Sequence, residues 1–106
     1  IYNLVFDAPD ALPYSKKYLD IFLDEMPANA VWFLTRHQAP GSLGFRDALE
    51  RGGHVRVGFE DGPFISSGQK ARSNAELVED IVQAAESLGR KVVGCAKARE
   101  SLELDT

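Results

Sequence analysis

The run AVWFLT at Ala30–Thr35 decides the fold, because apolar residues follow one another almost without interruption. A continuous run of this length indicates a strand that is buried on both faces, which is typical of parallel sheets. The run IYNLVF at Ile1–Phe6 has the same character. We therefore predict two parallel strands, each apolar throughout and covered on both faces.

A helical pattern follows each of these runs. The first helix is predicted over about 15–26, and Pro27 stops it because proline cannot continue a helix. The second, weaker helical stretch follows Pro40–Gly41 and ends at Gly52–Gly53, since glycine is common just past a helix C-terminus. The apolar residues of the two patterns are Tyr18, Leu19, Phe22, Leu23 and Met26, then Leu43, Ala48 and Leu49.

A third strand is predicted over His54–Glu60 (HVRVGFE), where side chains alternate in type. Val55, Val57 and Phe59 would face a layer of helices, while His54, Arg56, Gly58 and Glu60 would face the other way.

The clearest helical pattern begins at Ser73, where Glu76 three residues further on makes a capping box. Gly89 marks its end. Its expected buried stripe consists of Leu77, Val78, Ile81, Val82, Ala85 and Leu88. We expect a short extended piece at Lys91–Cys95 and a last short helix over Ala96–Leu104.

The alternation of strands and helices predicts a parallel α/β sheet. On the residues alone two architectures remain open: a small open doubly wound sheet, or part of a (β/α)8 barrel. A whole barrel takes about 250 residues, and this chain has 106. Because Ile1 already lies inside a strand-like run, we expect residues 1–106 to form one partial domain of a longer chain.

The composition argues against several functions. Twelve basic residues against 16 acidic ones give a net charge of −4, and no basic block favours binding to nucleic acid. No apolar run approaches the roughly 18 residues of a membrane helix. The single cysteine excludes an internal disulfide and suits a reducing compartment. Together with the lack of a signal-peptide pattern, this predicts a cytoplasmic protein.

The candidate site lies at the end of the third predicted strand. Glu60 and Asp61 end it, and ligands of α/β sheets and barrels bind at the carboxyl ends of the strands. Glu60 could ligate a metal, and Asp61 could act as a general base. Arg56, on the same predicted face as Glu60, could lock a neighbouring carboxylate or hold an anionic substrate in a bidentate pair. The alternative interpretation is an ordinary ion pair at the rim of a sheet.

Other polar residues admit simpler interpretations. Asp7 and Asp10 follow the first strand and are typical of turns and caps. Arg36–Gln38 follow the second strand, either as a solvated loop or as substrate contacts. His54 begins its strand and is expected to be structural. Cys95 has no nearby histidine or second cysteine and is not expected to be reactive.

Three strings in the chain are characteristic of a known family. They are GGHVRVGFED at Gly52–Asp61, SNAELVED at Ser73–Asp80 and LGRKV at Leu88–Val92. With RHQAP at Arg36–Pro40, they resemble the C-terminal third of the β-keto acid cleavage enzymes, the family that includes 3-keto-5-aminohexanoate cleavage enzyme. The resemblance extends over nearly the whole chain.

This resemblance implies a (β/α)8 barrel in which the chain supplies strands six, seven and eight. It implies a condensation of a β-keto acid with acetyl-CoA that yields acetoacetate and a new CoA thioester. In the family a divalent metal, usually zinc, is held by two histidines of an early strand and by the glutamate that corresponds to Glu60. The arginine and aspartate that correspond to Arg56 and Asp61 deprotonate the substrate. The two histidines lie outside this chain.

Two further hypotheses remain open at this stage. The chain could be a non-catalytic α/β module that self-associates, because three parallel strands leave open sheet edges that proteins normally cover. It could also belong to a different metal-dependent carbon–carbon lyase on the same barrel. In either enzymatic case we expect a homo-oligomer. Its expected ligands are the small-molecule substrates.

Overall fold

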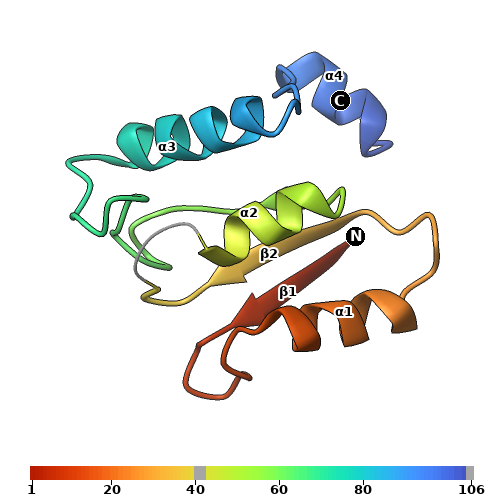
Figure 1. Cartoon of the computed structure of the whole chain (residues 1–106). Helices are drawn as coiled ribbons and strands as arrows, with labels where there is room; N and C mark the ends of the chain where they lie inside the picture. The colour runs from red at the N-terminus through yellow and green to blue at the C-terminus, as the bar shows by residue number, and fades with distance from the viewer. Residues whose placement is uncertain (40–42, 105–106) are drawn as a thin grey trace.

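The computed structural model describes residues 1–39 and 43–104 of the chain. Within them, strands and helices alternate from the N-terminus, as Figure 1 shows. The elements are β1 (Tyr2–Phe6), α1 (Lys16–Glu25), β2 (Trp32–Arg36), α2 (Leu43–Glu50), β3 (His54–Val55), α3 (Asn74–Ser87) and α4 (Cys95–Ser101). Pro40 and Gly41, predicted above as a break between β2 and α2, lie outside the described residues.

The three strands form one parallel sheet in the order β1-β2-β3. Leu34 in the central strand is paired with Leu4 on one side and Val55 on the other. The predicted alternation of parallel strands with helices is therefore confirmed. Parallel strands need a crossover, and here helices provide it.

Helices α1 and α2 both cover the same face of the sheet. The residues of this core are Phe6, Trp32 and Leu34 from the strands, Leu19 from α1, and Phe45 and Ala48 from α2. The strand residues of the set share one face because they lie at alternate positions of paired strands. Helix α3 continues the layer next to α2, where Ala84 and Ala85 pack against Leu49 (Figure 1).

The prediction that the first two strands are buried on both faces holds in part for β2, where Trp32, Leu34 and Thr35 are buried and Phe33 is partly exposed, and it fails for β1. In β1 the side chains of Tyr2 and Val5 are each 44% exposed. β1 has a neighbour on one side alone, and Val5 lies on the face opposite α1 and α2. On that face the Thr35 hydroxyl of β2 donates to Asn3 Oδ1 of β1 at 2.9 Å.

Serine side chains cap α1 and α3: Ser15, near the predicted start of the first helix, and Ser73, which was predicted as a cap. Ser15 Oγ accepts from the Tyr18 N–H at 3.1 Å, and Ser73 Oγ accepts from the Glu76 N–H at the same distance. These contacts satisfy N–H groups that have no partner within the first turn of a helix. The side chain of Glu76 does not complete the capping box, because it accepts from Arg72 Nε at 2.9 Å.

The extents of two elements and the burial of one residue were predicted wrongly. Strand β3 covers His54–Val55, whereas a strand was predicted as far as Glu60. The last helix covers Cys95–Ser101, whereas a helix was predicted over Ala96–Leu104. Residues Lys91–Gly94, predicted as an extended piece, form neither helix nor strand, with extended backbone at Gly94. Val78 of α3 is 50% exposed, because no neighbouring strand beyond β3 covers that side of the helix among the described residues.

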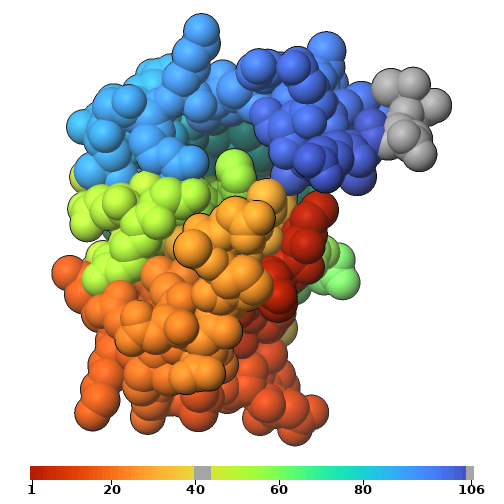
Figure 2. Space-filling view, turned by 90° about the vertical axis from the view of Figure 1, so that its right-hand side faces the viewer, coloured from red at the N-terminus to blue at the C-terminus, as the bar shows by residue number. Residues whose placement is uncertain are grey.

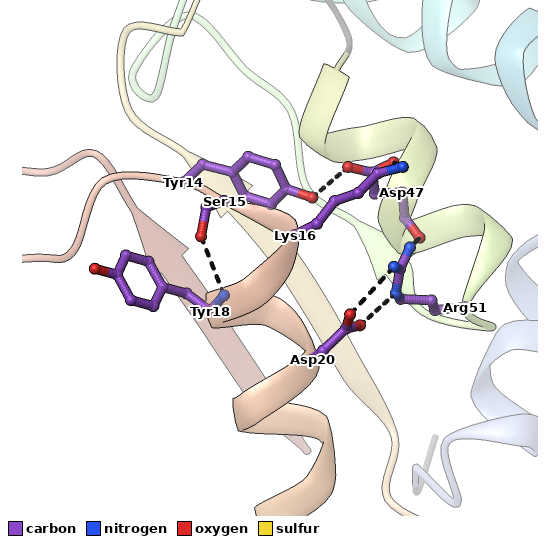
Figure 3. A network of polar contacts seen from close by, with 7 residues as sticks. All are labelled: Tyr14, Ser15, Lys16, Tyr18, Asp20, Asp47 and Arg51. Atoms are coloured by element: carbon purple, nitrogen blue, oxygen red, sulfur yellow. Dashed lines mark hydrogen bonds and ion pairs between the residues drawn. The ribbon is translucent and has the colours of Figure 1, made fainter.

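A polar network joins α1 to α2 (Figure 3). The Tyr14 hydroxyl donates to Asp47 Oδ2 at 2.5 Å, and Lys16 Nζ lies 3.6 Å from the other oxygen of the same carboxylate. Arg51, the residue after α2, donates from its Nε to Asp20 Oδ1 of α1 at 2.7 Å. Burial and the hydrogen bond to Asp47 raise the pKa of the Tyr14 phenol well above its usual value, so Tyr14 serves as a donor.

A groove of about 680 Å³ lies beside the outer edge of β3. Apolar side chains from four parts of the chain line it: Val55 and Val57, Ile81 and Val82 of α3, Val92 and Val93, and Ala98 and Leu102 of α4. Figure 2 shows the surface hollowed between the blue C-terminal segments and the green and orange atoms below. In the described part of the chain, no helix combines the length and hydropathy needed to cross a membrane.

Candidate functional site at the carboxyl ends of the strands

The carboxyl ends of the three strands are joined to one another by backbone hydrogen bonds. The His37 N–H donates to Phe6 O at 2.9 Å, and the Arg56 N–H donates to Leu34 O at 3.0 Å. The Gln38 N–H donates to Asp61 O at 2.5 Å. The segments that follow β1, β2 and β3 therefore meet at one edge of the sheet, where the polar candidates gather.

Glu60 and Asp61 lie in a tight turn over Gly58–Gly62 rather than at the end of a strand. The N–H groups of Asp61 and Gly62 both donate to Gly58 O, at 3.1 and 3.0 Å. Gly62 approaches the Gln38 backbone closely, since an added Cβ would lie 3.2 Å from Gln38 N. The turn places both carboxylates beyond the carboxyl end of β3, Glu60 exposed and Asp61 partly buried.

Arg56 and Asp61 form an ion pair across this turn. Arg56 Nε lies 3.8 Å from Asp61 Oδ2, with the arginine side chain 54% exposed and the aspartate side chain 20% exposed. A pair this loose and solvated contributes little to stability. Its geometry leaves the carboxylate oriented by the guanidinium but still accessible, which general-base chemistry requires.

A small cavity of about 20 Å³ lies beneath the pair. Its polar lining comes from Arg36, Arg56 and Asp61, and its apolar lining includes Phe45 and Leu77. This volume is sufficient for about one water molecule and not for an organic substrate. The described residues thus supply one wall of a site, and a substrate would have to contact that wall from outside.

Asp7 and Arg36 form a second, tighter pair at the same edge, which the sequence alone did not predict. Arg36 Nε donates to Asp7 Oδ2 at 2.7 Å, and the Tyr14 N–H donates to Asp7 Oδ1 at 2.9 Å. The Arg36 guanidinium also lies over the Tyr14 ring, 4.8 Å from its centre. The one available signal was that each residue directly follows a predicted strand.

Asp7 has a left-handed backbone, with φ of 69°. Burial favours the neutral acid, but the hydrogen bonds from Arg36 and the Tyr14 N–H outweigh it and lower the pKa of Asp7. A carboxylate with a lowered pKa stabilises the fold above the pH at which it titrates in the unfolded chain, about 4. This stabilisation is lost as the pH falls through the lowered value.

We expect Asp7→Asn to lower the free energy of unfolding at pH 7 by about 1 kcal/mol, since the carboxylate is partly solvated. Asparagine tolerates a left-handed backbone, so the substitution removes the charge without adding strain. Urea unfolding at several pH values would show the difference shrinking below about pH 4. Asp24→Asn, at an exposed position of α1, is the matched control; a difference that stays constant with pH would contradict this account.

Of the remaining candidates, His54 and Cys95 lie apart from this edge. His54 is at the opposite end of β3, where its ring stacks 5.0 Å from that of Phe33, and partial burial and Arg90 lower its pKa. Cys95 is an exposed free thiol at the start of α4. Asp10 is exposed in the loop after β1.

No metal-binding cluster exists within residues 1–39 and 43–104, because no three His, Cys, Asp or Glu side chains there could hold one ion. Zinc in proteins takes about four ligands, of which about three come from side chains in catalytic sites. Glu60 could supply one of them. These residues therefore do not form a zinc site by themselves.

The fold and the site define a class: a parallel α/β chain with an arginine and two carboxylates at the carboxyl edge of its sheet. The model of the beta-keto acid cleavage enzyme family matches residues 1–104, and the chain belongs to this family. The resemblance seen in the motifs is thereby confirmed.

Individual relatives are similar over most of the chain. A 3-keto-5-aminohexanoate cleavage enzyme of Acetoanaerobium sticklandii is 53% identical over 104 residues, which are 95% of this chain and 37% of that protein. The enzyme of the same name from Fusobacterium nucleatum is 41% identical over 88 residues, 79% of this chain and 31% of its own length. A 3-oxoadipate:acetyl-CoA acetyltransferase of Cupriavidus necator is 42% identical over 108 residues, which cover 96% of this chain and 37% of that protein. The chain spans about a third of the length of these relatives.

Proposed function

We propose that this chain carries the Arg–Asp pair and one metal ligand of a β-keto acid cleavage enzyme. The reaction condenses a β-keto acid with acetyl-CoA and yields acetoacetate and a new CoA thioester. The observation that carries the proposal is the turn over Gly58–Gly62, which brings Asp61 within 3.8 Å of Arg56 at the carboxyl edge of the sheet. The family match and the acetyl-CoA in a relative's name support the same chemistry.

In this proposal Asp61 is the general base. Its carboxylate takes a proton from the carbon next to the keto group, and the electron pair left on that carbon attacks the acetyl thioester carbonyl, which releases the CoA thiolate. Attack of this thiolate on the original keto carbon forms the new CoA thioester. The bond between the keto carbon and the acetylated carbon breaks, and that carbon takes a proton back to give acetoacetate. Arg56 orients the Asp61 carboxylate from the side and provides positive charge next to the anionic substrate. The exposure of the pair on the outer side of the turn gives a substrate access to the carboxylate.

Glu60 is proposed as one ligand of a divalent metal, with zinc as the expected ion. When bound, the metal would polarise the keto oxygen and so favour loss of the neighbouring proton. Glu60 is exposed at the carboxyl edge, next to Asp61 in the same turn, and is available to an ion held mainly by other parts of a full-length protein. The described residues lack the other ligands.

We further propose that the three β–α units are strands six, seven and eight of a (β/α)8 barrel. The parallel order β1-β2-β3 and the helices on one face of the sheet support this placement. The open edge of β3 supports it too, because the apolar groove beside it would cover a further parallel strand. The coverage of about a third of each relative agrees with three units of eight.

This placement predicts that the 106-residue chain on its own has no measurable turnover and holds zinc weakly. One carboxylate cannot replace a set of about four ligands. The measurement is acetoacetate formation from a β-keto acid and acetyl-CoA with added zinc, with the full-length protein assayed in parallel. Turnover by the 106-residue chain would refute this division of the site, and turnover by neither protein would refute the proposed function.

The same groove also favours a second candidate, a non-catalytic module that self-associates through its open sheet edge. Apolar surface beside an unpaired strand edge is the feature that drives such pairing. Sedimentation of the 106-residue chain distinguishes the two. A monomer argues against the module, whereas a stable dimer together with an inactive full-length protein would support it.

A further inference from the structure

The turn that holds Glu60 and Asp61 begins with an N–H group that the turn itself does not satisfy. Gly58 O accepts from Asp61 and Gly62, as in one turn of a helix. The N–H of Phe59 points out of the start of such a turn and needs an outside partner. Asn74, the first residue of α3, provides it: its Oδ1 accepts from the Phe59 N–H at 2.9 Å.

The side chain of Asn74 is not needed by its own helix. Ser73 already caps α3, with Ser73 Oγ accepting from the Glu76 N–H. Gly58 lies beside this contact, and a Cβ added there would be in ordinary van der Waals contact with Asn74 Oδ1 at 3.8 Å. The Asn74 side chain therefore accepts its hydrogen bond from a residue 15 positions earlier, immediately before Glu60.

A second residue of α3 holds the chain on the other side of the turn. Asp80 Oδ2 accepts from the Ser66 N–H at 3.0 Å and from the Ser66 hydroxyl at 2.8 Å. The loop that contains Ser66 folds back on itself through an antiparallel β-bridge between Phe64 and Lys70. Hydrogen bonds to α3 therefore hold the segment with Glu60 and Asp61 at Phe59, within the turn, and at Ser66, after it.

We propose that Asn74 is a positioning residue for the reaction, which fixes the backbone before Glu60 and Asp61 so that both carboxylates keep their places at the sheet edge. The inference rests on the proposed function. Asn74 is exposed, so water can replace its contact with Phe59 at little cost to stability. A displacement of about 1 Å in a catalytic group can nevertheless reduce the rate about 100-fold.

The test compares three variants of the full-length protein. Asn74→Ala should lower kcat by about 10- to 100-fold, the range typical of residues that orient metal ligands and their neighbours. Asn74→Asp keeps an acceptor at the same place and should restore most of kcat. Glu79→Ala, at an exposed position of the same helix, should leave kcat unchanged. An unchanged kcat in Asn74→Ala, or a loss that Asn74→Asp does not restore, would overturn the proposal.

Amide exchange of Phe59 tests the contact without any assay of activity. In Asn74→Ala this amide should exchange about fivefold faster, as expected for loss of one hydrogen bond of ordinary strength. The amides of α3 should keep their rates. If the wild-type protein has no turnover, the proposed function fails while the exchange still decides whether Asn74 holds the turn. An unchanged Phe59 rate would overturn the inference.

Discussion

Asp61→Asn in the full-length protein should lower kcat for acetoacetate formation by about 10²- to 10⁴-fold, the usual contribution of a general base. Asparagine has nearly the same size and cannot take up the proton. The backbone of the turn should survive, because Gln38 donates to the main-chain oxygen of Asp61 and not to its carboxylate. The substitution therefore removes the base and leaves its position intact.

Asp10→Asn is the matched control for this prediction. Asp10 is an exposed carboxylate in the loop after β1, at the same edge of the sheet. Its removal changes the charge of the protein equally and should leave kcat unchanged. If Asp61→Asn keeps a third or more of the wild-type kcat, the Arg56–Asp61 pair is an ordinary ion pair at the rim.

Gly53→Ala should lower the free energy of unfolding by about 3 kcal/mol, at the upper end of the usual cost of overpacking a core. The Trp32 ring lies directly against Gly53, and an added Cβ would overlap three atoms of its indole. Trp32 is buried in the central strand with Leu34 and cannot move aside without disturbing the core. Urea unfolding of the variant and the wild type measures the difference.

Gly52→Asn provides the contrast, since the two neighbouring glycines have different roles. Gly52 has φ of 84° and no atom within 4 Å of an added Cβ. Asparagine tolerates this backbone, so the cost should stay below about 1 kcal/mol. Equal costs at both positions would contradict the account, in which Gly53 makes room for Trp32 and Gly52 ends α2.

The fold was largely predictable because its signals are local. The apolar run of β2, the caps Ser15 and Ser73 and the glycine after α3 each depend on neighbouring residues alone. The length of β3 was mispredicted because the alternation HVRVGFE continues past Val55, where the chain leaves its partner strand. Burial of β1 was mispredicted since it depends on what lies against the second face of the sheet.

The candidate site also has a part that the sequence predicts and a part that it does not. Arg56, Glu60 and Asp61 were predictable because they share one short string, although their catalytic roles remain predictions. The Asp7–Arg36 pair joins residues 29 apart, and the Asn74 contact joins residues 15 apart. No periodicity or spacing predicts such contacts, because the path of the chain at the sheet edge creates them.

The most direct test of the central claim is product analysis of the full-length protein. Acetyl-CoA would be supplied with 3-keto-5-aminohexanoate or 3-oxoadipate, the β-keto acids in the names of the relatives. Mass spectrometry should detect acetoacetate together with a new CoA thioester, and Asp61→Asn should slow the formation of both by about 100-fold or more. Consumption of neither substrate in the presence of zinc, by a folded full-length protein, would contradict the proposal that this turn carries the chemistry of a β-keto acid cleavage enzyme.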